Sequence, residues 1–359
     1  MTVGARVLVM PDSFGGTLDA VEAAAAIGAG WHAGRPHDAV ALAPQSDGGP
    51  GFVEVLATAF GVRVRIQTVD GPLRTPVRAS WLLHERTAYL EVAQACGLNL
   101  VPDPDPRTAV EADTAGVGDL IAAALLAGSR RIVVGLGGSA STDGGRGACE
   151  RLGGPAAAAR LCRDVELIVA TDVDNPLLGA DGAAVTFGPQ KGADPAAVAF
   201  LEERMTRWAD RLAAAGGRDV RDLPGAGAAG GLGAALLAAG ARRVSGAGLI
   251  AELTRRPAAI ADADLVITGE GRIDAQTGHG KVVDAIAAEA TAAGVPLIVL
   301  VGESRLTDAE AARFGEVHSL THHAGSRAAA LANAGPELTS LTAELAAGWT
   351  GARGARSGY

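Results

Sequence analysis

Lysine occurs only twice in this chain, at Lys191 and Lys281, among 31 basic residues. Each lysine lies in a glycine-bearing motif, GPQKGA (188–193) and GRIDAQTGHGK (271–281). Arg serves elsewhere as the general surface cation. A retained Lys therefore indicates a need for a compact ammonium, which donates in any direction and can follow a moving phosphoryl group as a point charge. Two ordinary surface lysines are the alternative, and the neighbouring glycine, acid and amide residues favour a site.

A glycine-rich segment, GLGGSASTDGG (135–145), follows a run of strand character, RRIVV. Glycines such as Gly137 and Gly138 let backbone N–H groups turn toward one anion, and the start of a helix adds a positive dipole end. Ser139 adds a hydroxyl donor, and Asp143 can hold a metal or receive a proton. The segment also fits G-x-G-x-x-A, but no acid follows about twenty residues later, where a ribose-binding carboxylate is needed. Phosphate and metal handling is favoured, with a plain structural turn as the alternative.

Acidic residues end other runs of strand character. ATDVDNPLLG (170–179) presents Asp172, whose carboxylate suits Mg²⁺ or a base for a hydroxyl proton. Asp and Asn before Pro also form ordinary turns, so a structural role stays open. PDSFGGT (11–17) and APQSDGGPG (43–51) place further polar side chains at strand-to-helix junctions. These are Asp12, Ser13 and Asp47.

The segment TGEGRIDAQTGHGK (268–281) follows the run ADLVI and is the richest in ionisable and amide groups. Ligands of open α/β sheets bind at the carboxyl ends of strands, which is where this segment is expected. It fails the Walker pattern, because Ala275 and Val282 stand where Gly and Ser or Thr are required. Its candidate residues are Gly269, Glu270, Arg272, Asp274, Gln276, Thr277 and Lys281. A second glycine cluster, GAGAAGG (225–231), is either an anion nest or a set of small residues for close packing.

Short apolar runs alternate with alanine-rich segments of helical length, which predicts an α/β architecture with a parallel sheet covered on both faces. The expected strands are 5–10, 130–135, 166–171, 263–268 and 296–302. The expected helices are 18–33, with Thr17 as N-cap, and 117–127, 196–214, 231–240, 281–293 and 336–348.

The region 61–93 has a different pattern, with alternating polar and apolar residues and a turn at Asp70-Gly71-Pro72. It predicts antiparallel strands in a second, mixed domain. We therefore expect a discontinuous Rossmann-like domain, 1–65 with 255–359, and an inserted mixed α/β domain, 66–254.

Composition narrows the function classes. The formal net charge is −9, and a nucleic-acid partner is not expected without a basic surface. No stretch of 18 or more apolar residues is free of breakers and charges, so no membrane span is expected. The N-terminus, MTVGARVLVMPDS, has no h-region of signal-peptide length, so no signal peptide is expected. Three cysteines without metal-ligand spacing predict buried thiols. A cytoplasmic protein is the expectation.

Taken in order, these segments resemble the bacterial glycerate kinase family, type I, the glycerate 2-kinase group. The likeness covers almost the whole chain. Its long and specific signatures are TDV-NPL-G (171–179), FGPQKGA (187–193), GAGAAGGLG (225–233) and ADLVITGEGRID-QT--GK (263–281). The resemblance implies ATP-dependent phosphorylation of glycerate or a close hydroxy acid, usually to 2-phosphoglycerate, with Mg²⁺. It also implies a two-domain α/β fold unrelated to P-loop kinases, with the active site in the cleft. A homodimer is compatible, and the assembly stays open.

Roles follow from the resemblance as hypotheses. Glycine loops, including Gly137, Gly138, Ser139 and Gly269, with Glu270, Gln276 and Thr277, would hold ATP. Lys191 and Lys281 would neutralise the transferring charge, and Arg272 would bind the substrate carboxylate together with Asp12, Ser13 and Asp47. Asp172 or Asp274 would accept the hydroxyl proton, and Asp143 or Asp172 would hold Mg²⁺. Spacing does not assign which acid is base and which is ligand.

The chain departs from the family pattern near its N-terminus. Gly15 stands where the family usually has Lys, and Pro50 where it has Glu. A lost hydrogen-bonded charge costs about 1.5–3 kcal/mol. Two other readings therefore stay open: a weakened paralogue that binds nucleotide or hydroxy acid as a sensor, and a nicotinamide-dependent dehydrogenase, which rests on GLGGSA alone.

Overall fold

The computed structural model describes residues 4–216, 218–274 and 281–351. The chain forms two compact units, the first made of residues up to 46 and from 250 onward, the second of residues 47–249. The predicted domains, 1–65 with 255–359 and 66–254, stay a prediction, since compactness alone does not show independent folding. Within the described residues, no helix is both long and apolar enough to cross a membrane.

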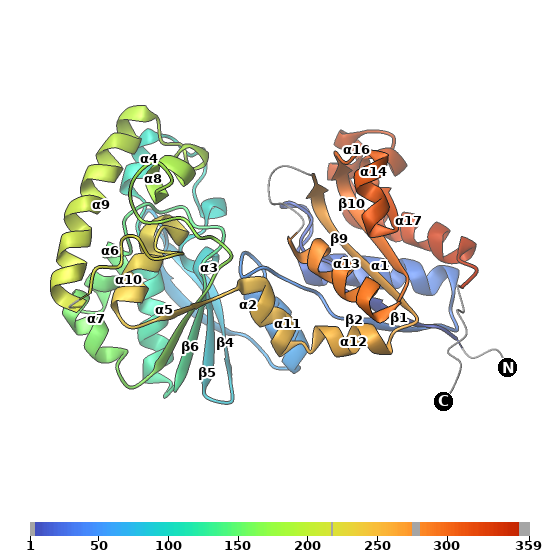
Figure 1. The fold of residues 1–359 in the computed structure, drawn as a ribbon, viewed down its shortest axis with the longest axis horizontal. Helices are drawn as coiled ribbons and strands as arrows, with labels where there is room; N and C mark the ends of the chain where they lie inside the picture. Colours follow the sequence, from blue (N-terminus) through green and yellow to red (C-terminus); the bar gives the residue numbers. More distant parts are fainter. Residues whose placement is uncertain (1–3, 217, 275–280, 352–359) are drawn as a thin grey trace. The chain divides into compact units, whose positions relative to one another are not determined.

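The first unit is built on a five-stranded, all-parallel sheet in the order β11-β10-β9-β1-β2. Its strands are β1 (Arg6–Val9), β2 (Ala39–Leu42), β9 (Leu265–Ile273), β10 (Leu297–Ser304) and β11 (Glu316–Ser319). Its helices are α1 (Ala20–Gly34), α12 (Arg256–Asp262), α13 (Lys281–Ala293), α14 (Asp308–Ala311), α15 (Leu320–His323), α16 (Arg327–Ala332) and α17 (Ala334–Gly348). This doubly wound arrangement (Figure 1) confirms the predicted α/β class.

Both faces of this sheet are covered, as the apolar strands predicted. Ile298 and Leu300 of β10 pack in the core shared with α1 and α17, whereas Val299 and Val301 pack with α13. Helices α1 and α17 approach so closely at Gly30 that a methyl group there would lie 2.3 Å from a carbonyl oxygen of α17. The close approach therefore requires glycine at this position. Small residues thus replace aromatics as the means of tight packing.

Helix α1 begins later than expected. The predicted N-cap, Thr17, is wrong: its hydroxyl donates to the Phe14 carbonyl, in the turn before the helix. Asp19 is the N-cap and forms a capping box with Glu22, because its carboxylate accepts the Glu22 N–H while the Glu22 side chain accepts the Asp19 N–H. Both residues suit an N-terminus, and the sequence did not distinguish them.

The second unit has a mixed six-stranded sheet in the order β3-β4-β5-β6-β7-β8. Strands β3 (Arg65–Asp70), β4 (Pro76–His84) and β5 (Thr87–Glu91) form the predicted antiparallel meander. Strands β5, β6 (Arg131–Gly135), β7 (Glu166–Ala170) and β8 (Arg242–Val244) run parallel. The helices are α2 (Phe52–Phe60), α3 (Val92–Cys96), α4 (Pro106–Glu111), α5 (Ala115–Leu126), α6 (Arg146–Arg151), α7 (Pro155–Leu161), α8 (Ala183–Phe187), α9 (Pro195–Gly216) and α10 (Leu232–Ala238); α11 (Gly246–Leu253) spans the division between units.

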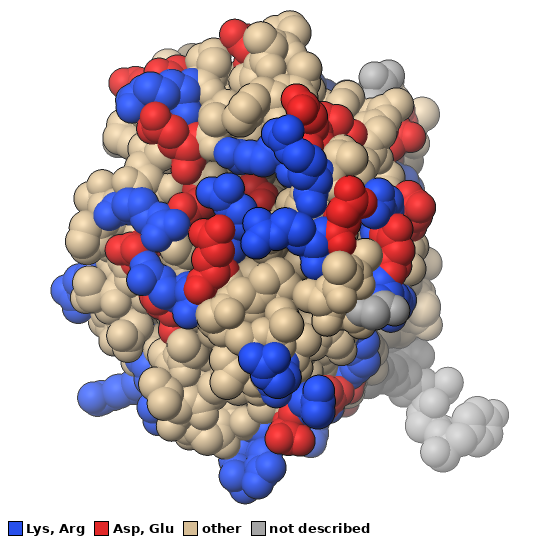
Figure 2. All heavy atoms as spheres, turned by 90° about the vertical axis from the view of Figure 1, so that its left-hand side faces the viewer, with Lys and Arg blue, Asp and Glu red and all other residues tan. Residues whose placement is uncertain are grey.

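Arginines on the side of α9 alternate with acidic residues (Figure 2). Arg207 pairs with Glu203 along α9, and Arg146 pairs with Glu150 along α6, both well exposed. Such exposed pairs contribute about 0–1 kcal/mol each. Arg242 lies on β8 and pairs with Glu166 of the neighbouring strand β7.

Candidate active site

In the second unit, residues 47–49 lie against the carboxyl ends of the parallel strands. The Gly137 N–H, just beyond β6, donates to the Gly48 carbonyl at 3.2 Å. A methyl group at Gly246, just beyond β8, would lie 1.8 Å from the Asp47 carbonyl oxygen. This segment is called the crossing segment below. It places the exposed Asp47 side chain at the sheet edge where ligands of α/β proteins bind.

Lys191 lies beneath the glycine-rich loop and is 3% exposed. Its Nζ donates to Ser139 Oγ at 3.0 Å and to the Ser141 carbonyl at 2.6 Å. Burial lowers the pKa of Lys191 to about 8, although the nearby charges of Cys96 and Asp143 act in the opposite direction. The structure therefore joins two predicted site residues, Lys191 and Ser139, that lie 52 positions apart.

Asp143 is buried inside the same loop. One oxygen accepts the Gly145 N–H at 2.9 Å, and the other accepts the N–H and hydroxyl of Thr114 and the Gly147 N–H. Burial raises the pKa of Asp143, while these hydrogen bonds lower it. Four donors from the chain itself mark this carboxylate as the organiser of the loop. Binding of a metal ion by Asp143 stays a prediction. The arrangement does not favour it, because both carboxylate oxygens already accept hydrogen bonds from the chain.

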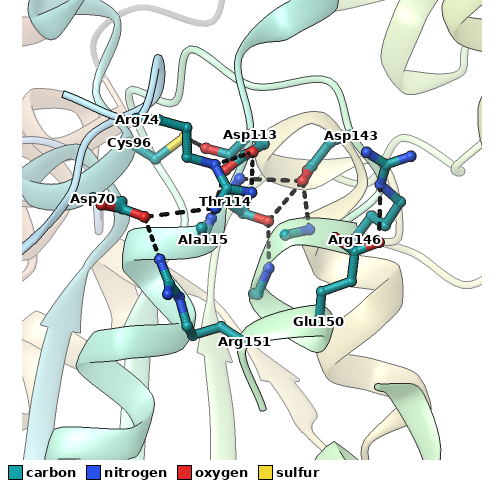
Figure 3. A network of polar contacts seen from close by, with 12 residues as sticks. Asp70, Arg74, Cys96, Asp113, Thr114, Ala115, Asp143, Arg146, Glu150 and Arg151 are labelled. Atoms are coloured by element: carbon teal, nitrogen blue, oxygen red, sulfur yellow. Dashed lines mark hydrogen bonds and ion pairs between the residues drawn. The ribbon is translucent and has the colours of Figure 1, made fainter. Parts of the chain in front are cut away.

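The network around Asp143 continues through α5 to the surface (Figure 3). Asp113 accepts from the Ala115 N–H at the start of α5 and pairs with Arg74 at 2.6 Å. Arg151 pairs with Asp70 and with Asp119. The buried Cys96 thiol donates to the Asp113 carbonyl, and burial raises its pKa to about 11. The glycine-rich loop is thus connected, through Asp143, Thr114 and Asp113, to ion pairs at the surface of this unit.

Replacing Asp143 by Ala is expected to lower the free energy of unfolding by several kcal/mol, since buried donors left without an acceptor cost about 1–3 kcal/mol each. Urea denaturation of D143A and wild type would measure the difference. Glu150→Ala is the matched control: it removes an exposed carboxylate from α6 and should change the free energy of unfolding by less than about 0.5 kcal/mol. A D143A variant as stable as the control would contradict this role.

Asp172 follows β7 and is half-buried. Its carboxylate accepts the Ala247 N–H at 3.2 Å, at the start of α11, and so draws that helix toward the end of β7. Asp174, the other acid of the segment, is exposed and pairs with Arg243. Asp172 thus lies just beyond the carboxyl end of β7, as Gly137 lies just beyond that of β6, which agrees with the strand-end position predicted for it.

The second glycine cluster belongs to the packing of this unit. A methyl group at Gly230 would lie 1.9 Å from the Ser141 carbonyl, and one at Gly227 would lie 2.3 Å from the Pro176 carbonyl. Of the two open interpretations, the structure favours close packing. This cluster supports the glycine-rich loop from the other side.

Glu91 was not identified from the sequence, although it ends β5 beside Gly135. Its side chain is 1% exposed and accepts the N–H groups of Gly51 and Val53 at 3.1 and 3.3 Å. Burial, together with the charge of Glu54, raises the pKa of Glu91 to about 8. The available signal was the acid at the end of a run of strand character, TAYLE, the same signal that identified Asp172.

In the first unit, the predicted residues gather where β1 and β9 end. The Asp12 N–H donates to the Gly269 carbonyl at 2.8 Å, and the Gly271 N–H donates to the Ser13 carbonyl at 3.1 Å. The Asp12 carboxylate accepts the Ser13 N–H. Gly15 has φ of +53° and lies against Gly271, which explains a glycine in this turn.

Arg272 and Asp274 form an ion pair of 2.7 Å at the end of β9, where Asp274 is 8% exposed and Arg272 is partly open. Glu270 lies on the same strand, half-buried. An arginine already held by one carboxylate retains further donors for a second, planar anion. Gln276 and Thr277, and the side chain of Lys281, lie outside the described residues.

Over the ranges the structure describes, no three His, Cys, Asp or Glu side chains gather as a metal-binding group. The three cysteines are free and buried, as predicted. Mg²⁺ is commonly held by one or two carboxylates plus substrate phosphates, so Asp172 at the sheet edge still fits that ion.

A parallel sheet and a mixed sheet, with glycine-rich loops, a buried ammonium and carboxylates at the ends of their parallel strands, are typical of enzymes that act on small anions. The sequence model of the glycerate kinase family matches this chain over residues 7–159 and 155–350, which is most of its length. The chain belongs to the glycerate kinase family and is an enzyme.

Individual relatives agree with this assignment. An uncharacterized protein of Mycobacterium bovis is 55% identical, with 95% of this chain and 91% of the relative covered. The glycerate 2-kinase of Escherichia coli K12 is 38% identical over 84% of this chain and 86% of its own. A crystal structure described as a glycerate kinase 2 of Salmonella typhimurium LT2 has a TM-score of 0.77 and 36% identity, covering 96% of this chain and 98% of that one.

Proposed function

We propose that this enzyme phosphorylates glycerate with ATP and Mg²⁺ and forms 2-phosphoglycerate. The observation that carries the proposal is the buried Lys191 ammonium, bonded to Ser139 and to the Ser141 carbonyl in the glycine-rich loop. A cation enclosed beneath a loop of glycines stabilises negative charge there more strongly than a solvated one. Transfer of a phosphoryl group depends mainly on such positioning and charge stabilisation.

The chain's own residues then have these roles. Gly137, Gly138 and Ser139 bind ATP phosphates through backbone and hydroxyl donors. Lys191 stabilises charge on the transferring group, and Lys281 is assigned the same role from its motif. Further ATP contacts are assigned to Gly269, Glu270, Gln276 and Thr277.

The hydroxy acid is assigned to residues with carboxylate, cationic or hydroxyl side chains. Arg272 would bind the substrate carboxylate, and Asp12, Ser13 and Asp47 would bind its hydroxyl groups. The hydroxyl oxygen forms a bond to the γ-phosphorus as the bond to ADP breaks, and its proton passes to Asp172 or Asp274. Mg²⁺ would be held by Asp172 and would neutralise phosphate charge. Cytoplasmic location and a homodimer stay predictions.

The sensor function is the second candidate, and two positions favour it. Gly15 is exposed, without a side chain to contact an anion, and Pro50 replaces a carboxylate beside Gly138 with a ring. Such a protein would bind glycerate or ATP without turnover.

A coupled ADP-release assay with Mg-ATP and D-glycerate tests the proposed function. Turnover at rates of about 1–100 per second is expected, and phosphorus NMR of the product would distinguish 2-phosphoglycerate from the 3-phosphate. L-Glycerate, tartronate and erythronate serve as comparators. Binding of D-glycerate by calorimetry, with no turnover on any of these acids, would favour the sensor.

A further inference from the structure

Glu91 is a buried carboxylate that the proposed chemistry does not use. Its side chain is 1% exposed, and an ionised carboxylate in such a place is costly unless it is paired or hydrogen-bonded. Its partners are not a cation but the backbone N–H groups of Gly51 and Val53 and the side chain of Gln94. A residue placed in this way acts on the backbone that it holds.

That backbone is the start of α2, directly after the crossing segment. The N-cap residue, Gly51, has φ of +91° and no side chain to accept the first N–H groups of the helix. Glu91 supplies the missing acceptor from a distance of 40 positions, with one oxygen receiving both N–H groups. Capping by this distant side chain fixes the position of the first turn of α2. It therefore also fixes the position of the crossing segment that leads into the helix.

The other end of this connection is the glycine-rich loop. Glu91 pairs with Gly135 in the parallel ladder between β5 and β6, so its backbone belongs to the strand beside the loop. The Phe52 ring lies against Gly135 as well, since a methyl group at Gly135 would be 3.2 Å from Phe52 Cδ1. The crossing segment is thus attached to the loop through both the side chain of Glu91 and the first turn of α2.

We propose that Glu91 is a positioning residue, which holds the crossing segment and Asp47 against the ends of β6 and β7 by accepting the Gly51 and Val53 N–H groups. The inference rests on the proposed function, in which Asp47 binds the hydroxy acid. Glu91 itself contacts neither substrate nor phosphate, so its effect is on where Asp47 lies. Loss of Glu91 therefore raises the KM for the hydroxy acid and leaves the KM for ATP nearly unchanged.

The charged and polar side chains beside Glu91 are those of Glu54 and Gln94. Glu54 of α2 lies near enough to raise its pKa, and Gln94 of α3 bridges the two, with its Nε2 donating to Glu54 at 3.3 Å. The Gln94 oxygen accepts the Ser80 N–H of β4. A Gln at position 91 keeps one oxygen that can accept both N–H groups and replaces the other oxygen with an amide NH2.

The test compares Glu91→Ala with Glu91→Gln. We expect E91A to raise the KM for D-glycerate by about 10-fold or more, as expected for lost hydrogen bonds to a fixed segment, with the KM for ATP changed by less than about twofold. E91Q should restore the KM to within about threefold of wild type, because its amide oxygen accepts the same N–H groups. Ile121→Ala, a cavity in the α5 core of the same unit, is the control for lost stability alone.

A second readout does not depend on turnover. Hydrogen exchange followed by mass spectrometry should show exchange of residues 47–53 accelerated by about 10-fold or more in E91A, and near wild-type exchange in E91Q and I121A. A folded E91A with unchanged KM and unchanged exchange would overturn the proposal, and so would an E91Q as impaired as E91A. If wild type shows no turnover at all, the proposed function fails, while the exchange data still decide the role of Glu91.

Discussion

Replacing Lys191 by Met is expected to reduce kcat by about 1000-fold or more, the size of effect found when a charge-stabilising group is removed from a closed site. Met fills nearly the same volume as the Lys stem, so the buried space beside Ser139 and Ser141 is not emptied. What is lost is the ammonium and its two hydrogen bonds. The coupled ADP-release assay measures kcat, and thermal unfolding measures whether the fold is retained.

Arg207→Met is the matched control, because it removes a cation from the same unit where the side chain is 66% exposed. It should change kcat by less than about twofold, as expected for a screened surface charge. If K191M folds like wild type and turns over at a comparable rate, Lys191 has no part in the chemistry.

The lowered pKa of Lys191 predicts that activity depends on pH if the ammonium stabilises the transferring charge. Burial lowers this pKa to about 8, below its value in the unfolded chain, so the ammonium is lost as pH rises through 8. If the ammonium is required, kcat/KM for ATP falls above pH 8. In the unfolded chain, Lys191 keeps its proton in this pH range, so the unfolded state binds more protons than the folded state. The contribution of Lys191 to the free energy of unfolding therefore rises with pH. A fall in activity without a matching loss of stability from this group would separate its chemistry from unfolding.

Much of the fold could be predicted because local patterns were consistent with one another. The strand runs at 5–10 and 296–302 are apolar on both faces, and β1 and β10 lie where parallel, doubly covered strands are expected. The alternating region 61–93 formed the antiparallel meander. The helix predicted at 281–293 has those bounds in the structure. Each of these features depends on residues close in sequence, where hydrophobic periodicity is a direct signal.

The sites were harder, because their contacts join distant residues. Position after an apolar run placed Gly137 and Asp172 just beyond the ends of β6 and β7, where the structure has them, whereas Arg272 lies within β9, which continues to Ile273 and not only to the predicted end at 268. It did not show that Lys191 would be enclosed beneath a loop 50 positions earlier, nor that Asp143 would accept four hydrogen bonds from its own surroundings. Such satisfaction of buried groups depends on the tertiary fold and leaves little trace in local sequence.

The high glycine content made a further part of the site difficult to predict. Fifty glycines provided too many candidates for phosphate loops, and several of them serve close backbone approach instead. Gly246 is one that sequence reasoning overlooked, since SGAG after β8 has the appearance of an ordinary turn. In the structure it is the glycine against which the Asp47 carbonyl rests, so backbone contact rather than a phosphate explains it.

Gly246→Ala is therefore expected to displace the crossing segment without changing any polar side chain. A Cβ atom at this position would lie 1.8 Å from the Asp47 carbonyl oxygen and 2.6 Å from its carbon, distances that require backbone to move. Because the carbonyl cannot rotate away as a side chain would, we expect the KM for D-glycerate to rise by about 10-fold or more and the free energy of unfolding to fall by about 1–3 kcal/mol.

Gly248→Ala, two residues along α11, separates this effect from a general response of the helix to alanine. A Cβ atom there would lie 3.1 Å from the Ser245 Oγ and 3.2 Å from the Ser245 Cβ, side-chain contacts that a small shift relieves, and alanine favours a helix over glycine by about 0.5–1 kcal/mol. G248A should thus be as stable as wild type or more so, with unchanged KM. Equal behaviour of the two variants in steady-state kinetics and urea denaturation would show that the crossing segment tolerates displacement, and the position of Asp47 would then not limit binding of the hydroxy acid.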